Sequence, residues 1–209
     1  MTTHSTPSAR PVSTRALTPL VAALAMAVRG CFGLPLWWPT TTRDGRRRCA
    51  CPKGLDCPPQ SRAKHPINVG WQQEATTDAA TIRGWFGRWP DMNYGIFLGP
   101  SRLIVLDEDD HDGTGAGREA IGRLEALAGP LPRTWCIATG GGGRHWYFDA
   151  PPDFDWHTEQ LVGNLSVLGL GPGVDVKYGG GLVVGVGSWH ISGRQYVPLM
   201  GLDGVLPWE

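Results

Sequence analysis

The sequence contains an acidic cluster whose position suits metal-dependent chemistry. An apolar run over residues 103–106 is followed at once by Asp107, Glu108 and Asp109. If this stretch is a strand, side chains alternate between its two faces, so Asp107 and Asp109 share one face and Glu108 points to the other. Two carboxylates placed in this way can bind a hard cation such as Mg²⁺ or Mn²⁺. The alternative is a strand that ends in a solvated acidic turn.

A further carboxylate, Asp175, lies between Val174 and Val176. In a strand, the two valines face a core, while Asp175 and Lys177 face the opposite side. If that side adjoins Asp107, three carboxylates converge, and a divalent metal would relieve their repulsion. The alternative is a surface strand that carries an Asp–Lys pair.

A Gly-rich stretch precedes two residues that could bind an anion. Residues 140–143 are all Gly, and Arg144 and His145 follow them. Open backbone amides suit the close approach of a phosphate, although a flexible hairpin turn would have the same composition. The stretch is neither a Walker loop nor a dinucleotide fingerprint, because it lacks Gly-Lys-Ser/Thr and does not open a helix. A later stretch, 187–194, offers hydroxyl, imidazole and guanidinium groups but lacks the Gly-x-Ser-x-Gly elbow of a hydrolase.

Clustered thiols indicate a second metal site. Cys49, Cys51 and Cys57 lie close together, and His65 follows them. Three thiolates and one imidazole can close a tetrahedral zinc site, which would order the Pro-rich loop over residues 40–66. Unrelated buried thiols are the alternative.

The same loop is basic, although the formal net charge of the 209-residue chain is zero. A neutral chain has no global field that attracts nucleic acid, so such binding must rest on a local patch. We expect the loop to contact a single-stranded template, the alternative being a solvated basic surface. The basic residues concerned are Arg46, Arg47, Arg48, Lys53, Arg62 and Lys64.

The chain shows no stretch that is long and apolar enough to cross a membrane. Arg10 and Arg15 precede an apolar run over 16–28, which gives a weak likeness to a signal peptide, but Pro19 interrupts the run. Clustered thiols suit a reducing compartment, so we expect a cytoplasmic location.

The elements expected around these motifs give an α+β fold. A tail over residues 1–16 should be disordered, and one domain should span 17–209. Short Gly connections between strands favour antiparallel pairing over a doubly wound sheet, and strands 93–98 and 103 onward should form a hairpin. Helices are expected over 17–29, 79–89 and 118–128, and strands over 31–38, 93–98, 134–139, 144–148, 174–178 and 182–186 as well as from residue 103.

Taken in order, these stretches resemble the bifunctional DNA primase/polymerase (prim-pol) domain of the archaeo-eukaryotic primase superfamily. The resemblance covers about residues 17–196. It rests on the order of the motifs Lys64-His65-Pro66, Val105-Leu106-Asp107-Glu108-Asp109, Gly142-Gly143-Arg144-His145, Gly173-Val174-Asp175-Val176-Lys177 and Ser188-Trp189-His190-Ile191-Ser192-Gly193-Arg194.

The resemblance implies a primase-like core, in which an RNA-recognition-like antiparallel sheet packs beside a second small α/β unit and the active site lies between them. Carried over, Asp107, Asp109 and Asp175 correspond to the catalytic metal-binding carboxylates, and His145 to the nucleotide-binding histidine. The chain departs from the family pattern in three places. It has Ala63 where Gly often precedes Lys-His-Pro, an all-Gly loop where Ser often occurs, and 185–187 in place of Pro residues.

We therefore expect a nucleotidyltransferase that makes or extends primers on single-stranded DNA from nucleoside triphosphates, using two Mg²⁺ or Mn²⁺ ions. A replicative helicase would be a separate chain. The rival functions are a non-catalytic DNA-binding replication-initiator module and a metal-dependent nuclease with the same acids. The residues expected to contact the triphosphate are Arg144, His145 and Lys177, with Ser188 and His190 as further candidates, and those that could stack on bases are Trp37, Trp38 and Trp71.

Overall fold

The computed structural model describes residues 17–110, 112–155 and 161–200, so the expected disordered tail lies outside the described part. The expected helices and strands are all present, with small differences at their ends. The helices are α1 (Pro19–Val28), α2 (Trp71–Glu74), α3 (Ala79–Arg88) and α4 (Ala116–Ala128), with 3-10 turns η1 (Gly54–Asp56), η2 (Pro59–Ser61) and η3 (Leu165–Leu168). The strands are β1 (Phe32–Leu36), β2 (Pro39–Thr41), β3 (Arg47–Cys49), β4 (Asn93–Phe97), β5 (Leu103–Glu108), β6 (Trp135–Ala138), β7 (Arg144–Asp149), β8 (Val174–Lys177), β9 (Leu182–Val184) and β10 (Val197–Met200).

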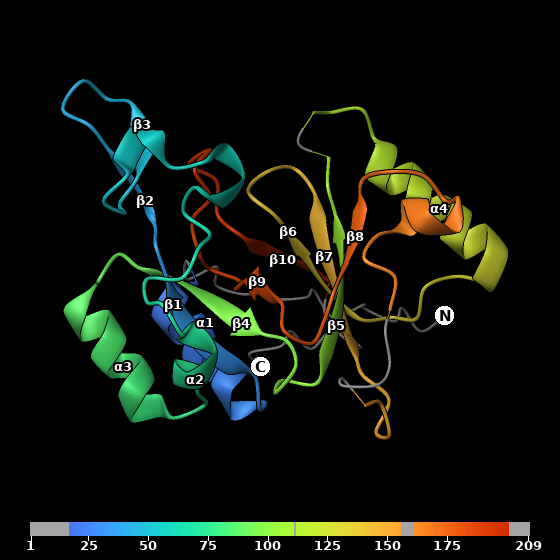
Figure 1. Cartoon of the computed structure of the whole chain (residues 1–209), viewed down its shortest axis with the longest axis horizontal. Helices are drawn as coiled ribbons and strands as arrows, with labels where there is room; N and C mark the ends of the chain where they lie inside the picture. The colour runs from blue at the N-terminus through green and yellow to red at the C-terminus, as the bar shows by residue number, and fades with distance from the viewer. Residues whose placement is uncertain (1–16, 111, 156–160, 201–209) are drawn as a thin grey trace, which may run out of the picture.

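The strands form three antiparallel sheets, as the short connections predict. One has the order β1-β4-β9, the second β10-β6-β7-β5-β8, and the third is the β2–β3 hairpin. In Figure 1, α1 and α3 lie beside the three-stranded sheet, α4 lies beside the five-stranded sheet, and the β2–β3 hairpin projects from the body. The mixed α/β architecture with antiparallel sheets is confirmed.

The expected hairpin between 93–98 and the strand from 103 is wrong, because β4 and β5 belong to different sheets. A tight turn joins them, in which the Arg102 amide donates to the Gly99 carbonyl at 2.9 Å. Gly99 also donates to the Gly179 carbonyl at 2.8 Å, so this turn packs against the turn that joins β8 to β9. Both turns therefore carry the chain from one sheet to the other.

Helix α1 contains the apolar run with the weak likeness to a signal peptide. The Thr18 hydroxyl accepts a hydrogen bond from the Val21 amide at 3.3 Å and caps the helix, and Pro19 occupies the first turn. Its buried face of Ala22, Ala23, Met26 and Ala27 packs into the main core. In the structure the run is thus a core helix.

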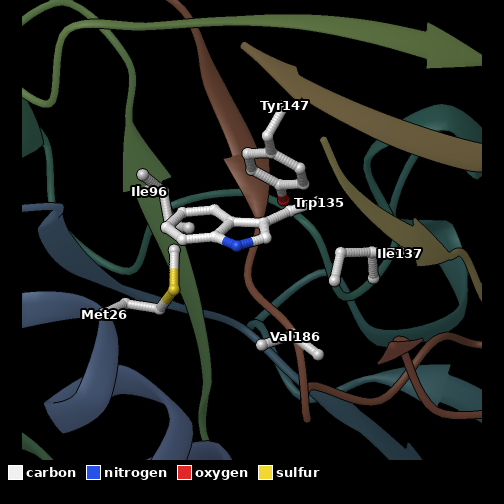
Figure 2. Close-up of a pocket in the computed structure, with 6 residues that line it drawn as sticks. All are labelled: Met26, Ile96, Trp135, Ile137, Tyr147 and Val186. Carbon is white, nitrogen blue, oxygen red and sulfur yellow. The ribbon is translucent and has the colours of Figure 1, made fainter. Parts of the chain in front are cut away.

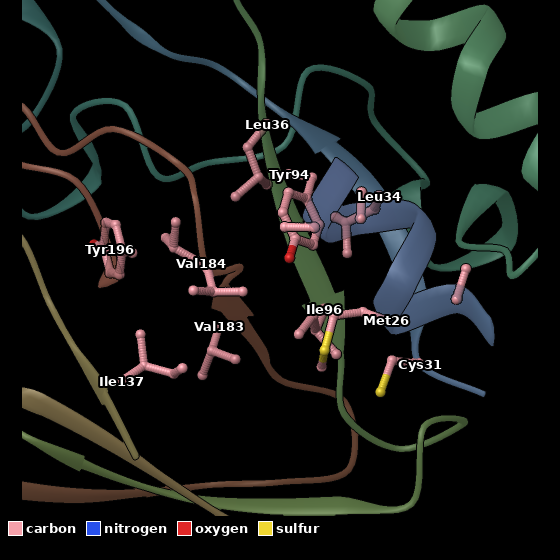
Figure 3. Close-up of a cluster of buried hydrophobic side chains, with 14 of the residues drawn as sticks. Met26, Cys31, Leu34, Leu36, Tyr94, Ile96, Ile137, Val183, Val184 and Tyr196 are labelled. Carbon is pink, nitrogen blue, oxygen red and sulfur yellow. The ribbon is translucent and has the colours of Figure 1, made fainter. Parts of the chain in front are cut away.

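The main core extends from α1 and α3 across the three-stranded sheet to the inner face of the five-stranded sheet. Figure 3 shows Met26 beside the strand that carries Tyr94 and Ile96, with Val183, Ile137 and Tyr196 on the other side. A small apolar cavity remains in this layer (Figure 2); it is lined by Met26, Ile96, Trp135, Ile137, Tyr147 and Val186.

Strand alternation gives the five-stranded sheet two different faces. Its inner face contributes Leu103 and Val105 of β5 and Tyr147 of β7 to the main core. Its outer face contributes Leu106 and Val176, among others, to a second core under α4. Beyond Val105, the inner face continues into polar residues, and there the candidate site begins.

Candidate active site

Three of the predicted site residues form a row across adjacent strands of the five-stranded sheet. Asp107 of β5 is paired in register with His145 of β7 on one side and with Asp175 of β8 on the other. Residues directly opposite each other in an antiparallel ladder point to the same face. The Nε2 atom of His145 lies 3.3 Å from Oδ1 of Asp107. The convergence of Asp175 with Asp107, left conditional by the sequence, is therefore present.

The row opens into a cleft of about 810 Å³ between the two larger sheets. One wall is the inner face of β5, β7 and β8, and the other includes residues of β9. A cleft of this size suits a nucleotide-sized ligand. The polar and charged side chains that line it are Gln60, Lys64, Asp107, Asp109, Thr139, His145, Asp175, Lys177, His190, Ser192, Arg194 and Tyr196.

Asp107 and Asp109 both line this cleft, as the alternation in β5 predicts, and Glu108 points the other way. Glu108 is buried, accepts a hydrogen bond from Trp146 Nε1 at 2.9 Å and lies 3.9 Å from Arg144 Nη1. Glu108 is thus satisfied on the α4 side of the sheet, while the flanking aspartates face the cleft.

The cleft places cations beside its carboxylates. Lys177 Nζ lies 2.6 Å from Asp175 Oδ2, so the Asp–Lys pair considered from the sequence exists inside the cleft. Burial alone would raise the pKa of Asp107, but His145, by its charge and hydrogen bond, and then Lys177 hold that pKa below its ordinary value. Asp107 is therefore a carboxylate at neutral pH, the form that binds a divalent cation.

The structure corrects the placement of Arg144. This residue is paired with Glu108 and, by alternation along β7, points to the face opposite His145. Its guanidinium lies over the Trp146 ring at 5.9 Å, and it does not line the cleft. The Arg144 side chain therefore lies on the outer face of the sheet, away from the residues that line the cleft.

Ser188 is also not brought to the cleft. Its side chain is fully buried. The hydroxyl accepts a hydrogen bond from the Tyr94 amide at 3.2 Å and donates to the Tyr94 carbonyl at 3.3 Å. Ser188 therefore ties the segment after β9 to β4, which is a structural role.

Arg194 is the cleft cation that the sequence-based site omitted. Its Nε donates to the Gly140 carbonyl at 2.9 Å, and Ser192 Oγ donates to the same carbonyl at 2.8 Å. These bonds fasten the 189–194 loop to the Gly-rich turn between β6 and β7. The sequence could have indicated this role, because Arg194 is the last residue of the 188–194 motif, one of those on which the family resemblance rests.

His190 lines the cleft as a neutral group. Burial, followed by the charges of Lys64 and Arg194, lowers the pKa of His190 to about 4. Its Nδ1 accepts a hydrogen bond from the Ser192 amide at 3.2 Å, so Nε2 carries the hydrogen. His190 can donate a hydrogen bond to a ligand but supplies no charge. The Tyr196 ring lies beside both histidines, with centroid distances of 5.8 Å to His145 and 6.2 Å to His190.

Cys49, Cys51, Cys57 and His65 form a compact cluster whose ligand atoms all lie within 4.8 Å of one another. His65 Nε2 lies 3.7 Å from Cys49 Sγ and 3.6 Å from Cys57 Sγ. Tetrahedral zinc, with Zn–S of about 2.3 Å and Zn–N of about 2.0 Å, would hold sulfur and nitrogen about 3.5 Å apart. The other ring nitrogen of His65 lies 3.3 Å from the Pro66 carbonyl, which leaves Nε2 for the metal. The cluster fits zinc.

The loop that carries this cluster is more ordered than its composition suggests. It contains the β2–β3 hairpin and two 3-10 turns, none of which the sequence predicted. Arg62 donates to the carbonyls of Cys57 and Leu55 at 2.6 and 2.7 Å. Arg62 thus braces the cluster and is a poor candidate for template contact.

The other predicted template contacts divide by position. Lys64 lines the cleft itself. Arg46 pairs with Asp44 at 2.8 Å, and the remaining three, Arg47, Arg48 and Lys53, are exposed.

The three tryptophans proposed for base stacking have other contacts. Trp71 makes an edge-on contact with Phe97 at 5.0 Å and packs on the main core. Trp37 packs on the cysteine cluster and stacks against Trp38 at 5.6 Å. Trp38 also lines a separate groove beside the β2–β3 hairpin.

Comparison with known families agrees with this geometry. The family model for the N-terminal domain of bifunctional DNA primase/polymerases, Prim-Pol, matches residues 23–205, which is nearly the whole chain. A search of curated proteins found no match. Within the described ranges, no helix has both the length and the apolar character needed to span a bilayer.

Proposed function

Since the chain belongs to the Prim-Pol family of bifunctional DNA primase/polymerases, we propose that it is a template-dependent nucleotidyltransferase that makes or extends primers on single-stranded DNA. The observation that carries this proposal is the register of Asp107, Asp175 and His145 across three neighbouring strands that face the cleft. Family membership supports the reaction class, and the row of side chains supports the location of the chemistry.

Asp107, Asp109 and Asp175 would hold two divalent cations in this cleft. Their donor atoms are carboxylate oxygens, the ligands that Mg²⁺ and Mn²⁺ prefer. When bound, such ions activate a 3′-hydroxyl and neutralise charge on a triphosphate and on the pyrophosphate that leaves. The oxygen atoms of these three carboxylates are farther apart than the ligand atoms of the cysteine cluster. Within the described residues, only that cluster has all its ligand atoms within 4.8 Å of one another. We infer that the triphosphate supplies the remaining oxygen ligands.

The other cleft residues would bind and orient the triphosphate. Lys64, Lys177 and Arg194 supply positive charge, which positions phosphate groups and stabilises charge as it develops. His190 donates a neutral hydrogen bond from Nε2. His145 holds Asp107 through the 3.3 Å contact and presents its ring to the cleft beside Tyr196.

Zinc bound by the cysteine cluster would have a structural role. It would join β3, the η1 turn and the segment that begins at Ala63, whose amide donates to Cys49 Sγ at 3.4 Å. Lys64, next to the ligand His65, lines the cleft. Zinc would therefore fix one wall of the site without taking part in the reaction.

A gel assay with a single-stranded template, labelled nucleoside triphosphates and Mg²⁺ or Mn²⁺ tests this function, with and without a primer. Asp107→Asn should lower incorporation at least about 10³-fold, because it removes a charged metal ligand. Asp153→Asn, which changes an exposed carboxylate outside the cleft, should leave incorporation unchanged. Equal melting temperatures would show that both variants are folded.

The rival functions give different results in the same assay. Release of nucleotides from the template without added triphosphates would indicate a nuclease. Template binding with no incorporation in either metal would indicate a DNA-binding module. Incorporation that survives Asp107→Asn would refute the proposed site.

A further inference from the structure

A second hollow adjoins the candidate active site. It is a groove of about 570 Å³, and it shares the 189–194 loop with the cleft. His190, Ile191, Ser192 and Arg194 of this loop line the cleft, whereas Trp189 and Gly193 line the groove. The rest of the groove comes mainly from the start of α1, from β2 and β3 and from Pro90 and Asp91. One short loop therefore separates the two hollows.

Trp189 is an exposed aromatic residue on a firmly held backbone. Its side chain is one of the exposed large hydrophobic groups of the described chain, at 43% exposure. Its amide donates to Asn93 Oδ1 at 2.8 Å, and its carbonyl accepts from Asn93 Nδ2 at 2.7 Å. Asn93 is fully buried and also donates to the Ala63 carbonyl at 2.9 Å. Hydrogen bonds to a buried side chain therefore hold the backbone of Trp189 in place. The exposed position of the ring is a feature of the fold and does not result from loop mobility.

Cationic and aromatic groups accompany Trp189 in the groove. The guanidinium of Arg47 lies against Gly193, where any side chain would collide with it and where φ is +81°. Trp38 supplies a second aromatic ring. Asp91 is the acidic side chain among the groove-lining residues. Aromatic rings interleaved with cations are the recognition chemistry of single-stranded nucleic acid.

We propose that this groove binds single-stranded DNA, with a base stacked on Trp189 and a phosphate at Arg47, and that the strand continues over the 189–194 loop toward the cleft. The proposal rests on the proposed function only in treating that strand as the template. Stacking on Trp189 would hold the strand beside the loop whose next residues, His190 and Arg194, face the nucleotide site. Template and triphosphate would then meet across one loop.

Fluorescence anisotropy of a labelled oligothymidylate, without triphosphates or divalent metal, tests the groove directly. Trp189→Ala should weaken binding about 5- to 150-fold, the usual effect of removing one stacked aromatic. Trp189→Phe should retain most of the affinity. Arg47→Ala should lower the slope of log affinity against log salt by about 0.7, the contribution of one phosphate on a single strand. Leu127→Ala, which removes an exposed apolar side chain outside the groove and the cleft, is the control.

The outcomes separate this inference from the proposed function. If the wild-type chain incorporates nucleotides but Trp189→Ala binds the oligonucleotide as well as wild type, the groove assignment is wrong and the polymerase stands. If wild type binds the oligonucleotide through Trp189 but incorporates nothing, the groove stands and the polymerase fails. A Trp189→Ala variant with unchanged melting temperature and lost binding supports the groove, whereas equal losses in Trp189→Ala and Leu127→Ala refute it.

Discussion

The substitution Gly140→Ala adds a single methyl group, which should push the 189–194 loop away from the rest of the cleft. A Cβ atom at Gly140 would lie 2.8 Å from the Arg194 carbonyl oxygen and 2.9 Å from His190 Cγ, and it would be closer still to His190 Cβ. Carbon atoms in van der Waals contact lie about 3.5–4.0 Å apart. The loop must therefore move outward in Gly140→Ala, and the bonds from Ser192 and Arg194 to the Gly140 carbonyl must lengthen.

The expected effect follows from those contacts. Overpacking of this kind costs about 1–3 kcal/mol of stability. Withdrawing a charged donor such as Arg194 from a phosphate costs about 1.5–3 kcal/mol of binding. At about 1.4 kcal/mol for each factor of ten, the KM for the triphosphate should rise about 10- to 150-fold.

The adjacent Gly141 provides a matched control. A Cβ atom there would meet Thr139 Oγ1 at 3.7 Å, an ordinary contact, and Gly141 also lines the cleft. Gly141→Ala should therefore leave the KM near the wild-type value. The assay is steady-state incorporation over a range of triphosphate concentrations at saturating template, with melting curves for both variants. Equal KM values for the two folded variants would refute the placement of His190 and Arg194 at the triphosphate.

Three further predictions concern the cleft and its supports. Cys57→Ser should lose about one equivalent of zinc, as measured by metal analysis, and should lower the affinity for triphosphate by displacing Lys64; full zinc content in this variant would contradict the cluster. The pKa of His190 at about 4 lies below its ordinary value of 6.5, so the unfolded chain binds more protons between these values and stability falls as pH decreases through this window. Denaturant unfolding of His190→Gln should show a weaker pH dependence there, and a dependence equal to that of wild type would disprove the assignment. Arg194→Ala should raise the KM for triphosphate about tenfold or more, whereas Arg144→Ala should mainly lower the melting temperature, and the reverse pattern would restore Arg144 to the site.

The sequence predicted the carboxylates because strand periodicity is a local property. Asp107 and Asp109 face the cleft and Glu108 faces α4, as alternation requires. The same rule applied to β7 places Arg144 on the face opposite His145, whereas the charge of Arg144 alone does not indicate its face.

Other features depend on contacts that no local pattern contains. Ser188 is held in the interior by hydrogen bonds to the backbone of Tyr94, which lies ninety-four positions earlier in the chain. The prediction of a β4–β5 hairpin is wrong for a similar reason. A short turn determines where the chain reverses, but it does not determine which sheet the next strand joins. The strands β2, β3 and β10 were missed because they are short and contain proline or arginine, which weaken a strand pattern.

The geometry of the site does not depend on the lengths of the segments that connect its residues, because strand pairing aligns Asp175, Asp107 and His145. Each side chain is placed by ladder hydrogen bonds between β8, β5 and β7, and the segments that connect these strands pass through α4, η3 and several turns. Insertions in such surface connections cost little loop-closure entropy and leave the ladder unchanged. A slip of one residue between β5 and β8 would instead turn Asp175 toward α4. Relatives of this chain can therefore differ widely in loop length, whereas the register in which these three strands pair must not shift by even one residue.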